Sequence, residues 1–294
     1  MNKKIIFILT VLLVTFSLGS AFAASATPKE LYIKALSQLD KFESKYPREQ
    51  SEIFKLRMVI DQLYNVTNSD ASTDPVDANG NLETPDLSVG SDIYDSCTGL
   101  ENDSLKRQLT KIVSKQVAVG YQAAQDIIFG KLDNFNGKVE GVYTGRILET
   151  VGEPDASNMN VEHSWPQSQG ATGIAKCDLH HLFPADSKAN GIRGNNPFGN
   201  VKNPSWENGG SCTDKKVFQV RLKQRGDTAR AKFYFAIRYN KSIGAAEEKV
   251  LRAWSKEDPV SDYERKRNDR IENFQHNRKP FVDHPEFIDK IQDF

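Results

Sequence analysis

The sequence predicts an α+β fold that is mainly helical and contains a small sheet. Apolar residues recur at helical spacing along much of the 294-residue chain. Strand-like runs are short and lie mainly between residues 139 and 183. No internal repeat is visible. These features predict helices packed around a small sheet, with an amino-terminal helical hairpin ahead of them.

Residues 1–23 are predicted to be a secretory signal peptide. The basic start MNKK precedes the apolar run IIFILTVLLVTFSLGSAFA, which ends in an A-x-A pattern at Ala21 and Ala23. A membrane anchor is the competing interpretation, but Ser17, Gly19 and Ser20 interrupt the second half of the run. We expect cleavage after Ala23 and a mature protein, periplasmic or secreted, that has no membrane span.

Residues 24–64 predict the helical hairpin. Thr27 can cap a helix, Pro28 suits its first turn and Glu30 completes a capping box. Apolar residues then follow at helical spacing until Tyr46–Pro47, and a second helix comes after this stop. We see no chemistry in this hairpin.

Residues 65–89 are predicted to be an acidic linker. The longer stretch from 65 to 104 holds nine Asp and Glu residues and no Lys or Arg. It is also rich in Ser, Thr, Asn, Gly and Pro, a composition typical of a solvated loop. A calcium loop in DPVDANGNLE is the weaker interpretation, because the spacing misses the EF-hand pattern.

The remainder, residues 90–294, is predicted to form one domain. Helices are expected over 105–129, over 229–240 as a buried helix, and in two pieces over 245–274 that break at Asp258–Pro259. A strand is expected over 139–146, and another strand-like segment opens at Val217.

Basic charge is concentrated late in the chain, although the formal net charge of the whole sequence is zero. Lys215–Lys241 contains nine Lys and Arg residues and one acid, Asp227. The segment 263–280 adds further Lys and Arg residues. Solvated helix faces would explain this pattern, and so would a groove for a polyanion. We expect the second arrangement, with the two segments contacting phosphate groups.

Three of the five histidines lie in two short runs, NVEHSWPQS and DLHHLFP. A strand is predicted over Asn160–Pro166 and a second, antiparallel strand over Asp178–Phe183, with Pro184 ending it. Asp186 and Ser187 can then cap a short helix, SKANGIR, that stops at Gly194. The local order is therefore strand, strand, helix.

Two oxygen donors and a histidine can meet in this unit. Glu162 and His163 point to opposite faces of a regular strand, so the strand must end or bulge there for both to serve one site. Asn190 lies on the short helix and can face back onto the strands. A carboxylate and an amide oxygen suit a hard cation such as Mg²⁺, and a histidine beside them can take a proton from water.

Four separated runs resemble the bacterial endonuclease I family. They are NVEHSWPQS, DLHHLFPADSKANGIRGNNPFG, RGDTARAKFYFAIRY and QHNRKPFVDHPEF, and the resemblance covers roughly residues 90–290. It implies an exported, non-specific endonuclease with a ββα-metal core. By the same resemblance His163 is the general base, Glu162 and Asn190 hold the divalent metal, and Arg193 lies near the phosphate.

The resemblance also implies the partners of the protein. The expected substrate is DNA bound through its phosphates, with RNA as an open second substrate, and the expected form is a monomer. The cation is expected to be Mg²⁺, with Mn²⁺ and Ca²⁺ left open. The alternative function is a non-catalytic extracellular nucleic-acid-binding protein, which would be expected to lack the Glu–His pair or the helix asparagine.

The other histidines and the cysteines leave further alternatives. Asp178, His180 and His181 could bind a second metal or zinc, but no compact zinc spacing is present, and we expect Asp178 and His180 to pack the strand pair. His276 and His284 are expected to be surface or capping residues. A disulfide is expected between Cys177 and Cys212, with Cys97 free. The family more commonly has a small polar residue at the position of Cys177.

Overall fold

The computed structural model describes residues 92–294 of the chain. The predicted signal peptide, helical hairpin and acidic linker lie outside the described residues. The described residues belong to one compact unit, Ser91–Phe294.

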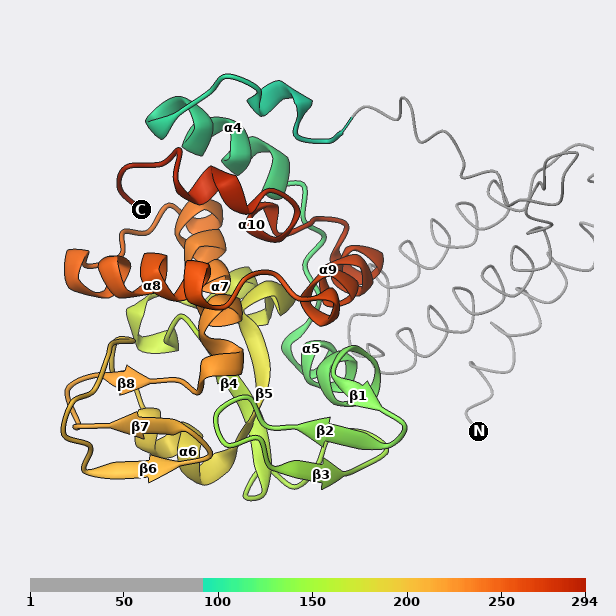
Figure 1. Ribbon diagram of the computed structural model, residues 1–294. Helices are drawn as coiled ribbons and strands as arrows, with labels where there is room; N and C mark the ends of the chain where they lie inside the picture. The colour runs from blue at the N-terminus through green and yellow to red at the C-terminus, as the bar shows by residue number, and fades with distance from the viewer. Residues whose placement is uncertain (1–91) are drawn as a thin grey trace, which may run out of the picture. The chain divides into compact units, whose positions relative to one another are not determined.

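Helices make up much of this unit (Figure 1). Among the described residues the α-helices are α4 (Asn102–Val113), α5 (Tyr121–Ile127), α6 (Ser187–Arg193), α7 (Arg225–Tyr239), α8 (Ala245–Glu257), α9 (Asp262–Gln275) and α10 (Pro280–Asp283). A π-helical turn, Ile128–Leu132, continues α5. The helix predicted over 105–129 is therefore divided into α4 and α5 by a non-helical segment.

The strands are short and form three small antiparallel sheets. The first sheet contains β1 (Asn134–Phe135), β2 (Lys138–Glu140) and β3 (Ile147–Glu149). The second pairs β4 (Met159–His163) with β5 (Leu182–Asp186), and the third contains β6 (Trp206–Asn208), β7 (Ser211–Thr213) and β8 (Phe218–Gln219). The predicted α+β class, mainly helical with little sheet, is confirmed.

Helix α7 runs through the middle of the unit, with α8 and α10 on one side and β4 and β5 on the other (Figure 1). Twelve of its 15 residues are buried, including the consecutive aromatic residues Phe233, Tyr234 and Phe235. A helix that is buried all round must satisfy its polar side chains inside the protein. The prediction of a buried helix here is confirmed, although it begins at Arg225 rather than at residue 229.

The basic residues of this region are not all on the surface, and the prediction of a basic phosphate-contacting surface is wrong at four of them. The exposed fractions of Arg230 and Lys232 are 1% and 2%, and those of Arg267 and Lys279 are both 3%. Each has at least one carboxylate partner from elsewhere in the fold: Lys232, for example, lies 3.2 Å from Glu247 of α8. These charges therefore hold the core together and do not face a polyanion.

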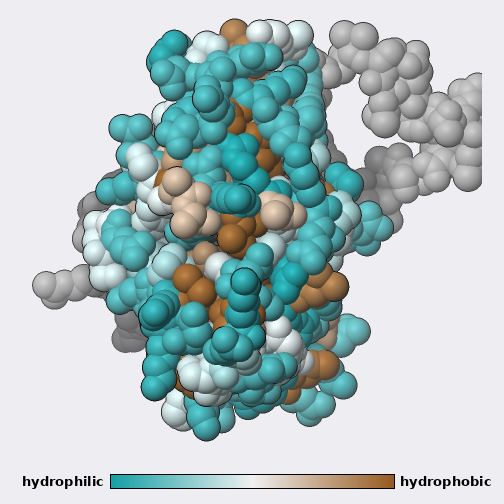
Figure 2. Space-filling model, turned by 60° about the vertical axis from the view of Figure 1, so that its left-hand side comes forward, coloured by the Kyte–Doolittle hydropathy of each residue, from teal (hydrophilic) through white to brown (hydrophobic). Residues whose placement is uncertain are grey.

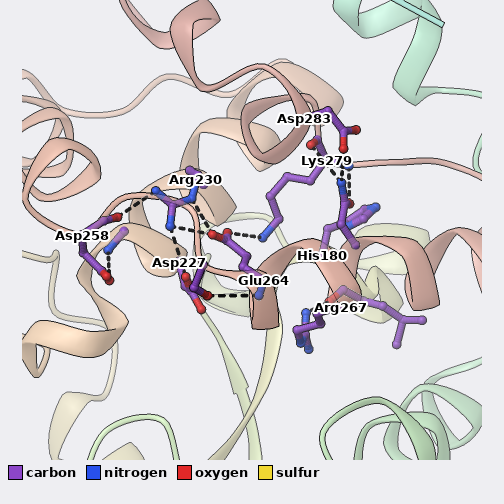
Figure 3. Close-up of polar contacts among 12 residues, drawn as sticks. His180, Asp227, Arg230, Asp258, Glu264, Arg267, Lys279 and Asp283 are labelled. Atoms are coloured by element: carbon purple, nitrogen blue, oxygen red, sulfur yellow. Dashed lines mark hydrogen bonds and ion pairs between the residues drawn. The ribbon is translucent and has the colours of Figure 1, made fainter. Parts of the chain in front are cut away.

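Figure 3 shows the largest of these buried charge clusters. Arg230 lies 2.6 Å from Glu264 and 3.2 Å from Asp227, and Lys279 lies 3.6 Å from Glu264. Burial and the negative charge of Glu264 hold the pKa of Asp227 well above its usual range. Burial alone would raise the pKa of Glu264, but the charges of Arg230 and Lys279 outweigh it and lower that pKa. The two pKa values are thus shifted in opposite directions, and Asp227 holds a proton more tightly than Glu264.

A second buried pair ties α9 to β5. The Arg267 guanidinium donates to both oxygens of Asp133, at 2.8 and 2.9 Å. It also donates to the carbonyl oxygens of Leu179 at 3.2 Å and Leu182 at 2.7 Å, where β5 begins. Removing one member of a buried ion pair leaves the other without a counter-charge, which is costly in free energy.

We expect Asp133→Asn to lower the free energy of unfolding by about 3–5 kcal/mol, because the buried Arg267 would lose its counter-charge. Chemical denaturation followed by circular dichroism measures this. The matched control is Glu149→Gln, which removes the exposed pair with Lys138 and should cost less than about 1 kcal/mol. Equal, small effects of the two substitutions would show that the Asp133 pair does not stabilise the fold.

The outer face drawn in Figure 2 is mostly hydrophilic, with apolar groups in small separate patches. Scattered apolar side chains of this kind are normal on soluble proteins. Among the described residues, no helix combines the length and the apolar character needed to cross a membrane.

Candidate active site

The site lies where β4, β5 and α6 meet. Glu162 of β4 pairs with Phe183 of β5, and His163 pairs with Leu182. The predicted bounds of both strands differ from those observed. The first strand ends at His163 rather than at Pro166.

The second strand begins later than predicted, at Leu182 rather than at Asp178. A 3₁₀ turn occupies Leu179–His181, and the side chain of Asp178 caps it by accepting a hydrogen bond from the His180 N–H at 3.0 Å. Pro184 lies inside this strand and does not end it. Within residues 92–294 this sheet has two strands, so each is an edge strand, where a proline can be accommodated.

Helix α6 spans Ser187–Arg193 as predicted. The Asp186 side chain accepts hydrogen bonds from the N–H groups of Lys188 and Ala189, at 3.1 and 3.2 Å. The helix ends at Gly194, whose φ of 54° favours glycine. Local capping therefore fixes both ends of the helix that carries Asn190 and Arg193.

All four predicted site residues line one cavity of about 170 Å³. The lining residues are Val161, Glu162, His163, Pro166, Gln167, Asn190, Arg193, Gly194 and Asn195. Since β4 ends at His163, the side chains of Glu162 and His163 are not held to opposite faces of a continuing strand. The end of the strand thus lets both residues reach the same cavity.

The ring of His163 is held in one tautomer. Its Nε2 lies 3.1 Å from the carbonyl oxygen of Lys176. A carbonyl oxygen only accepts hydrogen bonds, so Nε2 carries the proton and Nδ1 of the neutral ring is an acceptor. Burial, followed by the effect of nearby His181, lowers the pKa of His163 to about 3. The ring is therefore neutral at pH 7, with one nitrogen able to take a proton.

The carboxylate of Glu162 is buried, with an exposed fraction of 3%. Its Oε1 has no hydrogen-bond partner within the described part of the chain. The nearest cationic atom is Nη1 of Arg193, at 3.4 Å from Oε1. Arg193 therefore offsets the charge of the carboxylate, but Oε1 still lacks a hydrogen bond, so this oxygen can serve as a metal ligand.

The amide of Asn190 is oriented by strand β4. Its Nδ2 donates to Oδ1 of Asn160 at 2.8 Å and to the carbonyl oxygen of Val161 at 3.4 Å. Because a backbone carbonyl only accepts, Nδ2 must be on the strand side, which leaves Oδ1 on the other side of the amide. Asn160 was not among the residues predicted for the site. Its spacing of two from Glu162, which puts both on one face of the strand, was the available signal.

Arg193 is held by the backbone around the site. Its guanidinium donates to the carbonyl oxygens of His163 at 3.4 Å, Ser164 at 3.0 Å and Gly194 at 3.0 Å. Its exposed fraction is 2%. These contacts fix the end of β4. The expected role of Arg193 near the phosphate stays a prediction.

Asp178, His180 and His181 make contacts to the protein. Asp178 accepts hydrogen bonds from the hydroxyls of Tyr234 and Tyr239, both at 2.8 Å. Nε2 of His180 and of His181 lie 3.2 and 2.7 Å from backbone carbonyl oxygens. Burial lowers the pKa of each to about 3, so both rings are neutral. No group of three or more His, Cys, Asp or Glu suited to a metal occurs within residues 92–294.

The last two histidines are placed differently from one another. His276 is exposed and directly follows the last residue of α9, at the C-cap position. His284 precedes the 3₁₀ turn Pro285–Ile288, and its two ring nitrogens lie 2.6 Å from Asp92 and 2.9 Å from Glu286. The prediction of surface or capping roles is confirmed.

The expected disulfide between Cys177 and Cys212 is wrong. All three cysteines are free thiols. Cys177 is the last residue of the 3₁₀ turn Gly173–Cys177, which lies between β4 and β5 in the sequence. Cys212 is on β7, in the sheet formed by β6, β7 and β8. Sequence separation alone did not show that the two residues belong to different elements.

Comparison with known proteins defines the family. The sequence model described as Endonuclease I matches residues 102–286. The chain is 33% identical over 222 residues to an extracellular ribonuclease of Bacillus subtilis (strain 168), an alignment that covers 67% of this chain and 77% of the relative. It is 34% identical over 112 residues to an extracellular deoxyribonuclease of Aeromonas hydrophila, an alignment that covers 36% of this chain and 48% of the relative.

A periplasmic deoxyribonuclease of Aeromonas hydrophila is 32% identical over 112 residues, covering 36% of this chain and 47% of the relative. The protein belongs to the Endonuclease I family. It is accordingly an enzyme of the nuclease class, and the prediction made from its four sequence runs is confirmed.

Proposed function

We propose that this protein is an exported endonuclease that hydrolyses phosphodiester bonds of DNA with little regard to sequence and requires a divalent cation. One observation carries the proposal. Glu162, Asn190 and His163 line a single cavity, and His163 has the tautomer that a general base needs. Export is supported by the predicted signal peptide and by the relatives named extracellular or periplasmic.

The donors fit a hard divalent cation. Oε1 of Glu162 is a buried oxygen without a hydrogen bond among the described residues, and the Asn190 amide presents its oxygen away from the strand. Glu162 and Asn190 would supply two protein oxygens, which suits Mg²⁺, since Mg²⁺ keeps several waters and also binds substrate phosphates. Mn²⁺ and Ca²⁺ share this preference for oxygen. When bound, the cation stabilises negative charge on the phosphate and on the leaving 3′ oxygen.

We assign separate roles to His163 and Arg193. Nδ1 of His163 accepts the proton of the attacking water, while the carbonyl oxygen of Lys176 holds the opposite edge of the ring. The negative charge of a bound nucleic acid favours the protonated ring that results. Arg193 keeps the end of β4 in place through its three carbonyl contacts and lies beside Glu162.

Binding of the substrate is proposed to use phosphate contacts. The exposed Lys and Arg residues of the two basic segments include Lys215, Lys216, Lys223, Lys241, Arg265 and Lys266. Contacts of this kind read no bases, so cleavage is expected at many sequences. RNA has the same phosphate backbone and is a second candidate substrate, in agreement with the relatives that are named ribonucleases.

The domain organisation is part of the proposal. Residues 90–294 are proposed to be the nuclease domain, following the signal peptide 1–23, the helical segment 24–64 and the linker 65–89. The working form is proposed to be a monomer.

The test is incubation of the mature protein with supercoiled plasmid, with and without EDTA. We expect nicked and then linear DNA, followed by a smear of fragments, and no cleavage in EDTA. Binding without cleavage at any divalent-cation concentration would favour the alternative, a non-catalytic nucleic-acid-binding protein. A small set of discrete fragments would contradict cleavage without regard to sequence.

A further inference from the structure

Within residues 92–294, the lining of the cavity includes no Lys or Arg side chain that is free to move toward a substrate. Arg193 is the only Lys or Arg among the described residues that line it. Its exposed fraction is 2%, and its guanidinium is engaged by three backbone carbonyl oxygens. A nucleic acid brings a row of negative charges to this site, and these are commonly met by Lys and Arg side chains. A second, more mobile cation should therefore lie beside the cavity.

Lys176 is next to His163. Its carbonyl oxygen accepts the hydrogen bond from Nε2 of His163 at 3.1 Å. Its ammonium lies 4.0 Å from the ring centroid of Tyr121. The rings of Tyr121 and His163 are stacked, with centroids 5.8 Å apart and an angle of 29° between their planes. Lys176, Tyr121 and His163 thus form one contiguous group at the edge of the cavity.

The ammonium of Lys176 is available for another partner. Its side chain is half-buried, and within residues 92–294 no carboxylate oxygen lies within 4.0 Å of its Nζ. An aromatic face attracts an ammonium only weakly where water has access, whereas a phosphate oxygen makes a charge-assisted hydrogen bond. The ring of Tyr121 can therefore hold the ammonium in place and release it to a phosphate.

We infer that Lys176 and Tyr121 form a phosphate-binding subsite beside His163, in which Lys176 binds a phosphodiester group of the nucleic acid chain. The inference rests on the proposed function and names one residue, Lys176, that contacts the substrate. The backbone and the side chain of Lys176 have separate roles. The carbonyl oxygen orients the base through a contact that any residue at position 176 can make, while the ammonium belongs to lysine.

The experiment separates these two roles. Binding of a fluorescent duplex of about 20 base pairs is measured in EDTA, over a salt series, for wild type, Lys176→Gln and Lys176→Arg. The slope of log K against log salt is negative, and each lost phosphate contact reduces its magnitude by about 0.9. We expect that reduction for Lys176→Gln and an almost unchanged slope for Lys176→Arg. Calorimetry should find the same Mn²⁺ affinity in all three proteins.

The matched control is Lys290→Gln. The ammonium of Lys290 also lies over an aromatic ring, 5.3 Å from the centroid of Phe287, but that ring stacks with His284, whereas the ring of Tyr121 stacks with His163 of the cavity. Its salt slope should equal that of wild type. Thermal unfolding of each variant establishes that the fold is retained, and the arginine variant provides the result if the glutamine variant is unfolded.

Three results would overturn the inference. They are an unchanged slope for Lys176→Gln, an equal loss for Lys290→Gln, and a full loss of the contact in Lys176→Arg when that variant is folded. Failure of the proposed function would look different, because wild type would then leave plasmid intact with Mg²⁺. A wild-type enzyme that cuts plasmid, together with a Lys176→Gln variant that keeps its slope, rejects only the subsite.

Discussion

Replacing His163 with alanine is expected to lower the rate of DNA cleavage by about 10²–10⁴-fold while leaving DNA binding nearly unchanged. A general base acts only in the transition state, so its removal affects kcat and not the contacts that hold the substrate. The ring is well placed for this role because Nε2 is bonded to the Lys176 carbonyl and Nδ1 remains an acceptor. Plasmid cleavage rates with Mg²⁺ and duplex binding in EDTA measure the two quantities.

The control for this substitution is His276→Asn. His276 is exposed at the end of α9 and has a φ of 55°, a conformation that asparagine also accepts. The His276→Asn substitution should leave both the rate of cleavage and the affinity for DNA unchanged. Cleavage by His163→Ala at close to the wild-type rate would show that another group is the base.

Replacing Glu162 with glutamine is expected to weaken Mg²⁺ and Mn²⁺ binding by at least about tenfold, because even residues that only support metal ligands have effects of this size. The substitution keeps the shape of the side chain and removes its charge. The carboxylate is buried, and although Arg193 lies 3.4 Å from its Oε1, that oxygen has no hydrogen-bond partner among the described residues, so we expect it to bind the divalent cation. Titration calorimetry with Mn²⁺ measures the affinity directly.

Cleavage by this variant should recover in part at raised Mg²⁺ or Mn²⁺, since a weakened site fills at higher cation concentration. Asn190→Ala should behave in the same way. Glu272→Gln, at a carboxylate on the surface of α9 that contacts Arg278, is the matched control and should bind Mn²⁺ like wild type. Unchanged Mn²⁺ affinity in both Glu162→Gln and Asn190→Ala would reject the ligand assignment.

The parts of the fold that could be predicted are those fixed by neighbouring residues. Helix α6 was predicted from Asp186 to Gly194 because its cap and its stop are both local signals. The start of β5 was not predicted correctly, because the turn before it depends on residues far away in the sequence. Tyr234, Tyr239 and Gln275 all reach Asp178, from 56 to 97 positions along the chain.

The buried charges could not be predicted for the same reason. A run of Lys and Arg with one acid indicates a basic surface when only its own sequence is considered. Arg230 and Lys232 find their carboxylates on α9 and α8, at Glu264 and Glu247. The candidate site residues were predicted from the resemblance to the endonuclease I family. The hydrogen bond from Asn190 to Asn160 joins residues 30 positions apart, so no local sequence signal predicted it.

The turn that begins β5 also bears on when the enzyme becomes complete during synthesis. Gln275 accepts the hydrogen bond of the Leu179 N–H, and Arg267 donates to the carbonyl oxygens on either side of the turn. The ribosome makes the amino-terminal part of a chain first, so these two supports emerge long after β4 and α6. A nascent chain therefore carries Glu162 and His163 without the contacts that hold the second strand. The order of translation therefore leaves the turn before β5 without these supports until Arg267 and Gln275 have been added.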